Sequence, residues 1–109
     1  MLRVNFIESI RNTFTKGIEL VERKNADYAG ADNPFKNFES ALVVGIPVER
    51  AILVRVLDKL SRVSNLIGRE AQVKDEKIED TLLDAINYLA ILKAYLEDKN
   101  DLPTMPREL

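Results

Sequence analysis

Three polar side chains are conspicuous because they interrupt a segment whose other residues are mostly apolar. They are Asp80, Asp84 and Asn87, in the run EKIEDTLLDAINYLAILKAYLE over residues 76–97. At about 100° per residue on a helix, the three fall within roughly 60° of one another. A helix that is apolar around most of its circumference is normally buried, and buried carboxylates are normally paired or hold a metal. This polar stripe is therefore the first candidate for chemistry.

The composition limits what that chemistry can be. The chain has no Cys and no His, so thiolate nucleophiles, Ser-His-Asp triads and Cys/His zinc sites are excluded. Any bound metal must have oxygen ligands, which favours Mg²⁺ or Mn²⁺ over Ca²⁺. The chain also lacks Gly-rich phosphate loops of the GxxxxGK[ST] or GxGxxG type, so a nucleotide would have to be held in another way.

Charged residues on two other predicted helices could complete a site with the polar stripe. Glu19 and Glu22 form an E-x-x-E pair, and Glu22 borders the apolar side of its helix. In the middle of the chain, Asp58, Lys59 and Arg62 belong to a second polar face. Taken alone, each set is typical of a solvated helix face with i,i+4 ion pairs. If the middle helix faces the polar stripe, its cations could hold phosphate oxygens.

Two interpretations of Asp84 remain open from the sequence. Acidic residues are favoured at a helix N-terminus, which explains Asp80 better than Asp84, already two turns into the segment. Asp84 either joins an acidic cluster that binds a cation, or it pairs with Arg62 or Lys59.

Length and composition predict a single all-α domain spanning 1–109. The chain of 109 residues is 46% hydrophobic and 31% charged, with only four Gly and four Pro, which favours long helices. A net charge of −2 and a pI near 5.2 argue against a nucleic-acid binder.

The beginning, MLRVNFIESIR, is interrupted by charge too early for a signal peptide, and the longest apolar run, 41–48, is too short for a membrane span. We therefore expect a cytoplasmic protein without membrane partners.

Helical periodicity predicts three long helices, near 5–25, 47–67 and 76–98. Asn5 is the expected cap of the first helix, and Gly68 is the expected end of the second. The apolar residues of the first helix that recur at helical spacing, and are expected to be buried, are Ile7, Ile10, Phe14, Ile18 and Val21.

The connecting segments are predicted from Gly, Pro and polar residues. Residues 26–40 contain Gly and Asn-Pro and are expected to form a loop, followed by one or two helical turns within 38–44 that end at Gly45. A polar linker is expected at 69–75, and an irregular tail at 98–109. The aromatic residues of the first loop, which either pin it to the body or offer a stacking surface, are Tyr28, Phe35 and Phe38.

Three such helices predict an antiparallel bundle. The helix near 76–98 is apolar on too many sides for a three-helix monomer to cover. We therefore expect the core to be completed by self-association, as a homodimer or a larger homo-oligomer.

Three segments together resemble a known family. Glu19-x-x-Glu22, the middle run VRVLDKLSRVSNLI and the later run IEDTLLDAINYLAIL resemble the all-α nucleoside triphosphate pyrophosphatases, the MazG-like superfamily. Members carry E-x-x-E on one helix and E-x-x-D on a later one, which together hold Mg²⁺. The segment KNADYAGADNPFKNF, followed by DKLSR and DTLLDAINY, is most similar to small phage and prophage proteins of the nucleotide-modification-associated type. The resemblance spans about residues 16–95.

The acidic motifs depart from the family pattern. The later motif is Asp80-x-x-x-Asp84 in place of E-x-x-D, and the gap that separates it from Glu22 is longer than the family's spacing. If the middle helix is instead the counterpart of the E-x-x-E helix, its acids are reduced to Asp58, with Arg62 where a carboxylate is expected. Either mapping implies an altered metal site.

The resemblance implies an Mg²⁺-dependent hydrolase that splits a nucleoside triphosphate into monophosphate and pyrophosphate, with Mn²⁺ as an alternative metal. The implied metal ligands are Glu19, Glu22, Asp58, Asp80 and Asp84; the cations that offset developing charge are Lys59 and Arg62; and the substrate-binding residues are Lys24, Tyr28 and Asn87. The altered motif favours an alternative, a non-catalytic nucleotide-binding protein. A third hypothesis is a purely structural helical dimer, with its acids in ion pairs.

Overall fold

The computed structural model describes residues 2–27, 33–68 and 77–99, and all regular structure in these ranges is helical. The elements are α1 (Arg3–Asp27), α2 (Lys36–Glu39), the 3₁₀ helix η1 (Ser40–Val44), α3 (Val48–Leu66) and α4 (Ile78–Asp98). The prediction of an all-α chain is confirmed. Tyr28, the linker at 69–75 and the tail from residue 100 onwards lie outside the described residues.

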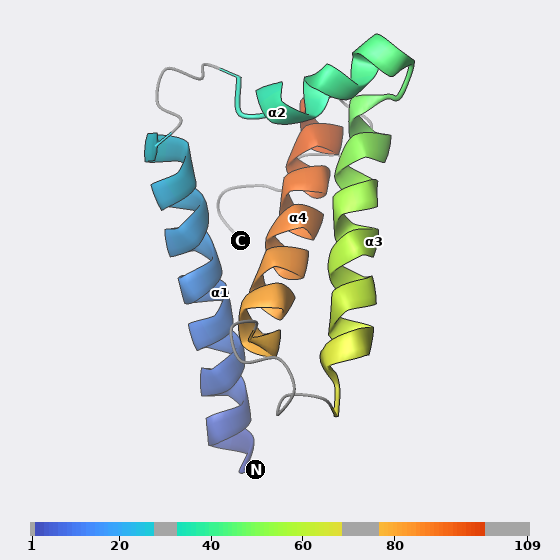
Figure 1. Cartoon of the computed structure of the whole chain (residues 1–109). Helices are drawn as coiled ribbons and strands as arrows, with labels where there is room; N and C mark the ends of the chain where they lie inside the picture. Colours follow the sequence, from blue (N-terminus) through green and yellow to red (C-terminus); the bar gives the residue numbers. More distant parts are fainter. Residues whose placement is uncertain (1, 28–32, 69–76, 100–109) are drawn as a thin grey trace.

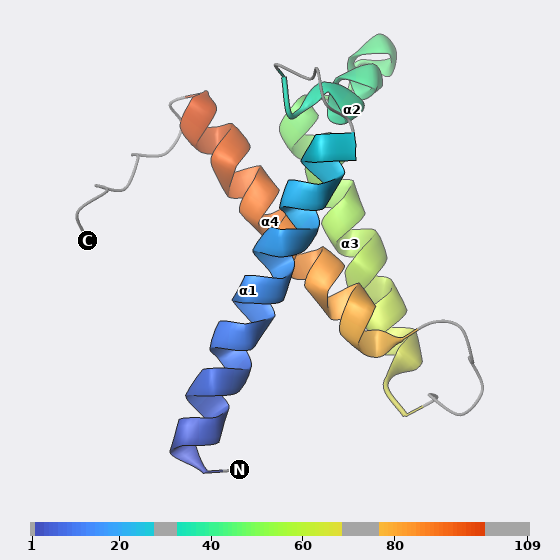
Figure 2. The ribbon, with the colours of Figure 1, turned by 90° about the vertical axis from the view of Figure 1, so that its left-hand side faces the viewer.

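The three long helices lie in the spatial order α1, α4, α3 (Figure 1). α1 and α4 both run upwards in that view and α3 runs downwards, while α2 and η1 connect across the upper end. Figure 2, turned by 90°, shows α1 crossing α4 obliquely, with α3 behind α4. α4 packs chiefly on α3 and more sparsely on α1. The result is an open layer of helices in which α4 has neighbours on two sides.

Among the described residues, the buried side chains belong to α3 and α4, which pack closely on each other. On α3 they recur at helical spacing, which places them on one face and accounts for the packing of this helix on α4. Ile52 is the largest fully buried side chain among the described residues. The buried hydrophobic residues are Val48, Ile52, Val56 and Leu66 on α3 and Ala85 on α4. The core of the described chain is therefore small and excludes the side chains of α1.

The expected burial of the first helix's apolar stripe is wrong for the single chain. Ile7, Ile10, Phe14 and Ile18 are 46%, 44%, 61% and 54% exposed. Val21, the fifth residue of the expected stripe, is half-buried. The periodicity correctly grouped these side chains on one face, but α1 approaches α4 through a neighbouring face, at Gly17. α4 is also incompletely covered, since its Leu82 and Leu89 remain exposed.

The two glycines predicted to end helices do so, but the residue predicted to cap the first helix does not. Gly45, with φ 76°, ends η1 in the left-handed conformation, and Gly68 has φ 79° just after α3. Glycine adopts such angles without the steric penalty of a Cβ. Asn5 is not the cap of the first helix, because α1 already begins at Arg3. The predicted loop at 26–40 was also too long, because α1 continues to its end at Asp27 and α2 forms within it.

The aromatic residues before η1 attach this segment to α4. The rings of Phe35 and Tyr95 meet edge to face with centroids 5.1 Å apart, and those of Phe38 and Tyr88 are 6.2 Å apart at a similar angle. Such edge-to-face geometry is favoured by the quadrupoles of the rings. Of the two roles expected for these phenylalanines, pinning the loop to the body is the one observed.

Within the described residues, no helix has the combination of length and apolarity needed to cross a membrane.

Candidate functional site

The best-defined polar contact between the long helices joins Lys59 of α3 to Asp84 of α4. The Lys59 Nζ and Asp84 Oδ2 atoms are 3.1 Å apart, and the two side chains are 21% and 25% exposed. Beside this pair, Thr81 is buried, and its hydroxyl donates to the carbonyl of Lys77 at 3.4 Å. Because the Thr81 hydroxyl has a hydrogen-bond acceptor one turn earlier in the chain, the side chain can be buried on the side of α4 that faces α3. Of the two interpretations that the sequence left open for Asp84, an acidic cluster or an ion pair, the structure shows the ion pair, with Lys59 as the partner.

Asn87, three residues further along α4, contacts α1. Its side-chain amide donates to the Gly17 carbonyl, with Nδ2 and the oxygen 3.2 Å apart. A Cβ at position 17 would lie 2.9 Å from Asn87 Oδ1. The close approach of these helices therefore depends on a glycine in the middle of α1. Gly17 was not among the candidate residues predicted from the sequence, although a lone glycine inside a helical pattern often marks a close approach.

The remaining candidate residues lie on exposed surfaces. Asp58 and Arg62 of α3 and Asp80 of α4 are exposed. Arg62 also interacts with another residue, so it is not without a partner. On α1 the exposed candidates are Glu19, Glu22 and Lys24. Tyr28 lies outside the described residues. The structure therefore brings Lys59 and Asp84 together, and Asn87 one turn beyond them.

A metal site formed by several carboxylates is absent from the part of the chain that the structure describes. No three acidic residues in these ranges gather closely enough to hold an ion. The E-x-x-E pair on α1 and the acids of α4 therefore do not converge into the four-carboxylate cluster that the family pattern implies. In the described residues, a single chain does not offer a closed protein cage for Mg²⁺.

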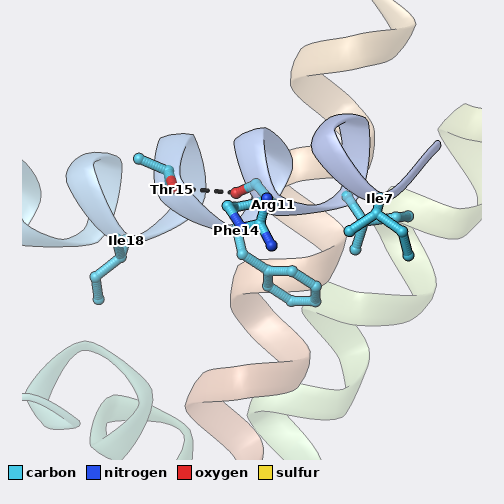
Figure 3. Close-up of a pocket in the computed structure, with 6 residues that line it drawn as sticks. Ile7, Arg11, Phe14, Thr15 and Ile18 are labelled. Atoms are coloured by element: carbon cyan, nitrogen blue, oxygen red, sulfur yellow. Dashed lines mark hydrogen bonds between the residues drawn. The ribbon is translucent and has the colours of Figure 1, made fainter. Parts of the chain in front are cut away.

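Two concave surfaces lined by described residues flank α1. One, of about 580 Å³, lies between α1 and α4 and is bridged by Lys16 and Glu79, whose Nζ and Oε1 atoms are 3.2 Å apart. Neither Asp80 nor Asp84 lines it. The other, of about 640 Å³, is formed by α1 alone (Figure 3), and its lining residues are Ile7, Ile10, Arg11, Phe14, Thr15 and Ile18. The first is lined by both polar and apolar side chains and bridged by an ion pair, whereas the second is an open apolar face.

Comparison with protein-family models, with curated proteins and with solved structures finds no match to this chain.

Proposed function

We propose that the protein binds a nucleotide through its phosphates at the polar surface shared by α3 and α4. The observation that carries the proposal is the Lys59–Asp84 contact at 3.1 Å. It places the two segments DKLSR and DTLLDAINY side by side, although they are far apart in the sequence. These are the segments whose resemblance to the MazG-like proteins implies a nucleotide ligand. As part of the same proposal, we expect the protein to act in the cytoplasm.

Cations on the same side of α3 support binding of an anion. Arg55, Lys59 and Arg62 follow one another at helical spacing, so they form one row. Lysine and arginine are the side chains that proteins use most for phosphate oxygens. Because the Lys59–Asp84 pair is partly exposed, exchange of its carboxylate partner for a phosphate costs less than it would in a dry core.

The described acids fit a limited role for magnesium. Mg²⁺ is often held by one or two carboxylates plus substrate phosphates, without a cage made wholly of protein ligands. Asp80 and Asp84 lie one turn apart on α4 and could supply such carboxylates to a magnesium ion that arrives with the nucleotide. The bound ion would supply charge neutralisation of the phosphates. This arrangement supports binding more directly than hydrolysis.

Thermal unfolding with nucleoside triphosphates, each with and without Mg²⁺, tests the binding proposal. A ligand at one hundred times its Kd stabilises the native state by about 2.7 kcal/mol, which corresponds to a rise in Tm of several degrees. We expect this rise in the wild type and its loss in Lys59→Ala. Lys16→Ala is the matched control, because it also removes a lysine from an interhelical ion pair. No nucleotide response in the wild type would reject the proposal.

Hydrolysis is measured separately. The activity implied by the resemblance, release of pyrophosphate from a nucleoside triphosphate, requires Mg²⁺ or Mn²⁺. Pyrophosphate release by the wild type that is abolished in both Asp84→Asn and Lys59→Ala would establish the enzyme. Binding without release would establish the non-catalytic nucleotide-binding protein, for which the dispersed acids of the described chain are the supporting observation.

A structural helical dimer is the second candidate function, and it has its own supporting observation. The apolar face of α1 is exposed in the single chain. Large contiguous apolar surfaces on a folded protein mark sites of association.

A further inference from the structure

The exposed apolar face of α1 is a continuous stripe. It consists of Ile7, Ile10, Phe14 and Ile18, each of which recurs three or four residues after the last and is at least 44% exposed. Figure 3 shows the labelled stripe residues Ile7, Phe14 and Ile18 projecting from one helix. We name these four residues the α1 stripe. Within the described residues, no other element joins α1 in lining the hollow along it.

The rest of the chain holds α1 weakly. Among the residues whose burial the structure describes, the buried hydrophobic side chains come from α3 and α4, and on α1 only Gly17, which lacks a side chain, is buried. Among the described residues, two polar side-chain contacts tie α1 to α4: the hydrogen bond from Asn87 to the Gly17 carbonyl, and the exposed ion pair between Lys16 and Glu79. Helices in proteins owe most of their stability to packing of an amphipathic face. The described part of the chain does not supply that packing to the apolar face of α1.

We infer that the α1 stripe packs against the α1 stripe of a second copy of this chain, with the two helices antiparallel about a two-fold axis. Most soluble oligomers are symmetric homo-oligomers, and a two-fold interface uses the same patch on both subunits. Pairing of the two helices over about four turns buries on the order of 1,200 Å² in total, the lower end of the range for specific interfaces.

Charge on one edge of the stripe specifies the antiparallel direction. Arg11 and Glu22 are about three turns apart and differ by only roughly 20° around the helix axis, so they lie on the same edge. In the described part of the chain neither forms an ion pair. In an antiparallel pair related by a two-fold axis, the same edge of each helix lies on the same side of the interface. Arg11 of each subunit therefore meets Glu22 of the partner subunit, and the dimer contains this ion pair twice. Antiparallel pairing also opposes the two helix dipoles.

Sedimentation equilibrium of single variants tests the position of the interface. We expect the wild type to dimerise at micromolar concentration, and Phe14→Asp to raise the dimer dissociation constant more than about a hundredfold. Val43→Asp is the matched control, because Val43 of η1 is 89% exposed and lies off the stripe. A monomeric wild type would overturn the inference. So would dissociation by Leu57→Asp, on the exposed side of α3, with no effect of Phe14→Asp.

A charge exchange tests the pairing without altering the apolar stripe. We expect Arg11→Glu and Glu22→Arg each to weaken the homodimer about tenfold, because each creates two like-charge contacts. The double variant Arg11→Glu/Glu22→Arg restores wild-type association. A mixture of the two single variants forms a heterodimer in preference to either homodimer, because both ion pairs are then restored. If neither the double variant nor the mixture recovers association, antiparallel pairing of α1 is excluded. Circular dichroism confirms that each variant remains helical.

Discussion

Asn87 of α4 and Gly17 of α1 meet where the two helices cross. The Asn87 side-chain amide donates to the Gly17 carbonyl at 3.2 Å, and the amide oxygen occupies the space that a Cβ at position 17 would enter, 2.9 Å away. The glycine and the asparagine therefore form one unit: the missing side chain admits the amide, and the amide satisfies a backbone acceptor.

This relationship predicts that Gly17→Ala has different effects on stability with and without the Asn87 side chain. Gly17→Ala gains about 1 kcal/mol of helix propensity but displaces Asn87, so we expect little net change in the free energy of unfolding. After Asn87→Ala, which alone costs about 1 kcal/mol, the obstruction is gone. The same Gly17→Ala change should then stabilise the protein by about 1 kcal/mol. Urea unfolding of the four variants measures both steps, and equal effects in the two backgrounds would contradict the proposed steric coupling.

The Lys59–Asp84 pair predicts the effect of neutralising Asp84. Asp84→Asn leaves Lys59 without its carboxylate partner in a site where the side chains are only 21% and 25% exposed. We expect a cost of about 1–2 kcal/mol, between the values for exposed and fully buried pairs. Glu79→Gln, which breaks the exposed Lys16–Glu79 pair, should cost less than about 0.5 kcal/mol. Chemical denaturation gives both values. A gain in stability for Asp84→Asn would instead indicate an acidic cluster relieved of repulsion.

Much of the fold follows from local pattern. The 3.6-residue periodicity located all three long helices, and Gly45 and Gly68 marked the ends of η1 and α3 as expected. Periodicity also grouped the apolar residues of α1 correctly. It does not encode which neighbour covers that group, because the angle at which α1 crosses α4 depends on contacts between residues far apart in sequence, above all Gly17 with Asn87.

The same limit applies to the candidate site. The pairing of Asp84 with Lys59 was one of two alternatives that the sequence left open, and helix-to-helix packing was needed to choose between them. The distance of Glu19 and Glu22 from the acids of α4 could not be predicted either. Each residue's position around its own helix was clear, but the relative placement of the helices was not. Local spacing thus identified candidates without showing which of them meet.

The contact between Phe35 and Tyr95 predicts a measurable coupling. The rings meet edge to face with centroids 5.1 Å apart, a geometry worth about 0.5–1.5 kcal/mol beyond area burial. A double-mutant cycle with Phe35→Leu and Tyr95→Leu should return a coupling free energy of this size. Phe6→Leu combined with Tyr95→Leu is the control, because Phe6 is exposed on α1, and this pair should be additive. An equally additive result for Phe35 and Tyr95 would show that the segment is held by other contacts.

The N-terminus of α3 predicts a dependence of stability on pH in the acid range. The pKa of Glu49 is held below its ordinary value, first by a hydrogen bond from the backbone at the start of α3 and then by Lys99, whose Nζ lies 3.4 Å from Glu49 Oε2. A carboxyl whose pKa is lower in the folded state stabilises the fold above its unfolded-state pKa, and this contribution is lost as pH falls through the folded-state pKa. NMR titration should therefore place the Glu49 pKa below the ordinary value for a glutamate, and Lys99→Met should raise it only part of the way, because the backbone hydrogen bond remains. Glu49→Gln should flatten the acid limb of the stability curve, whereas the control Glu8→Gln, on the exposed surface of α1, should leave it unchanged. An acid limb that is the same in Glu49→Gln and wild type would show that this carboxyl does not contribute to folding.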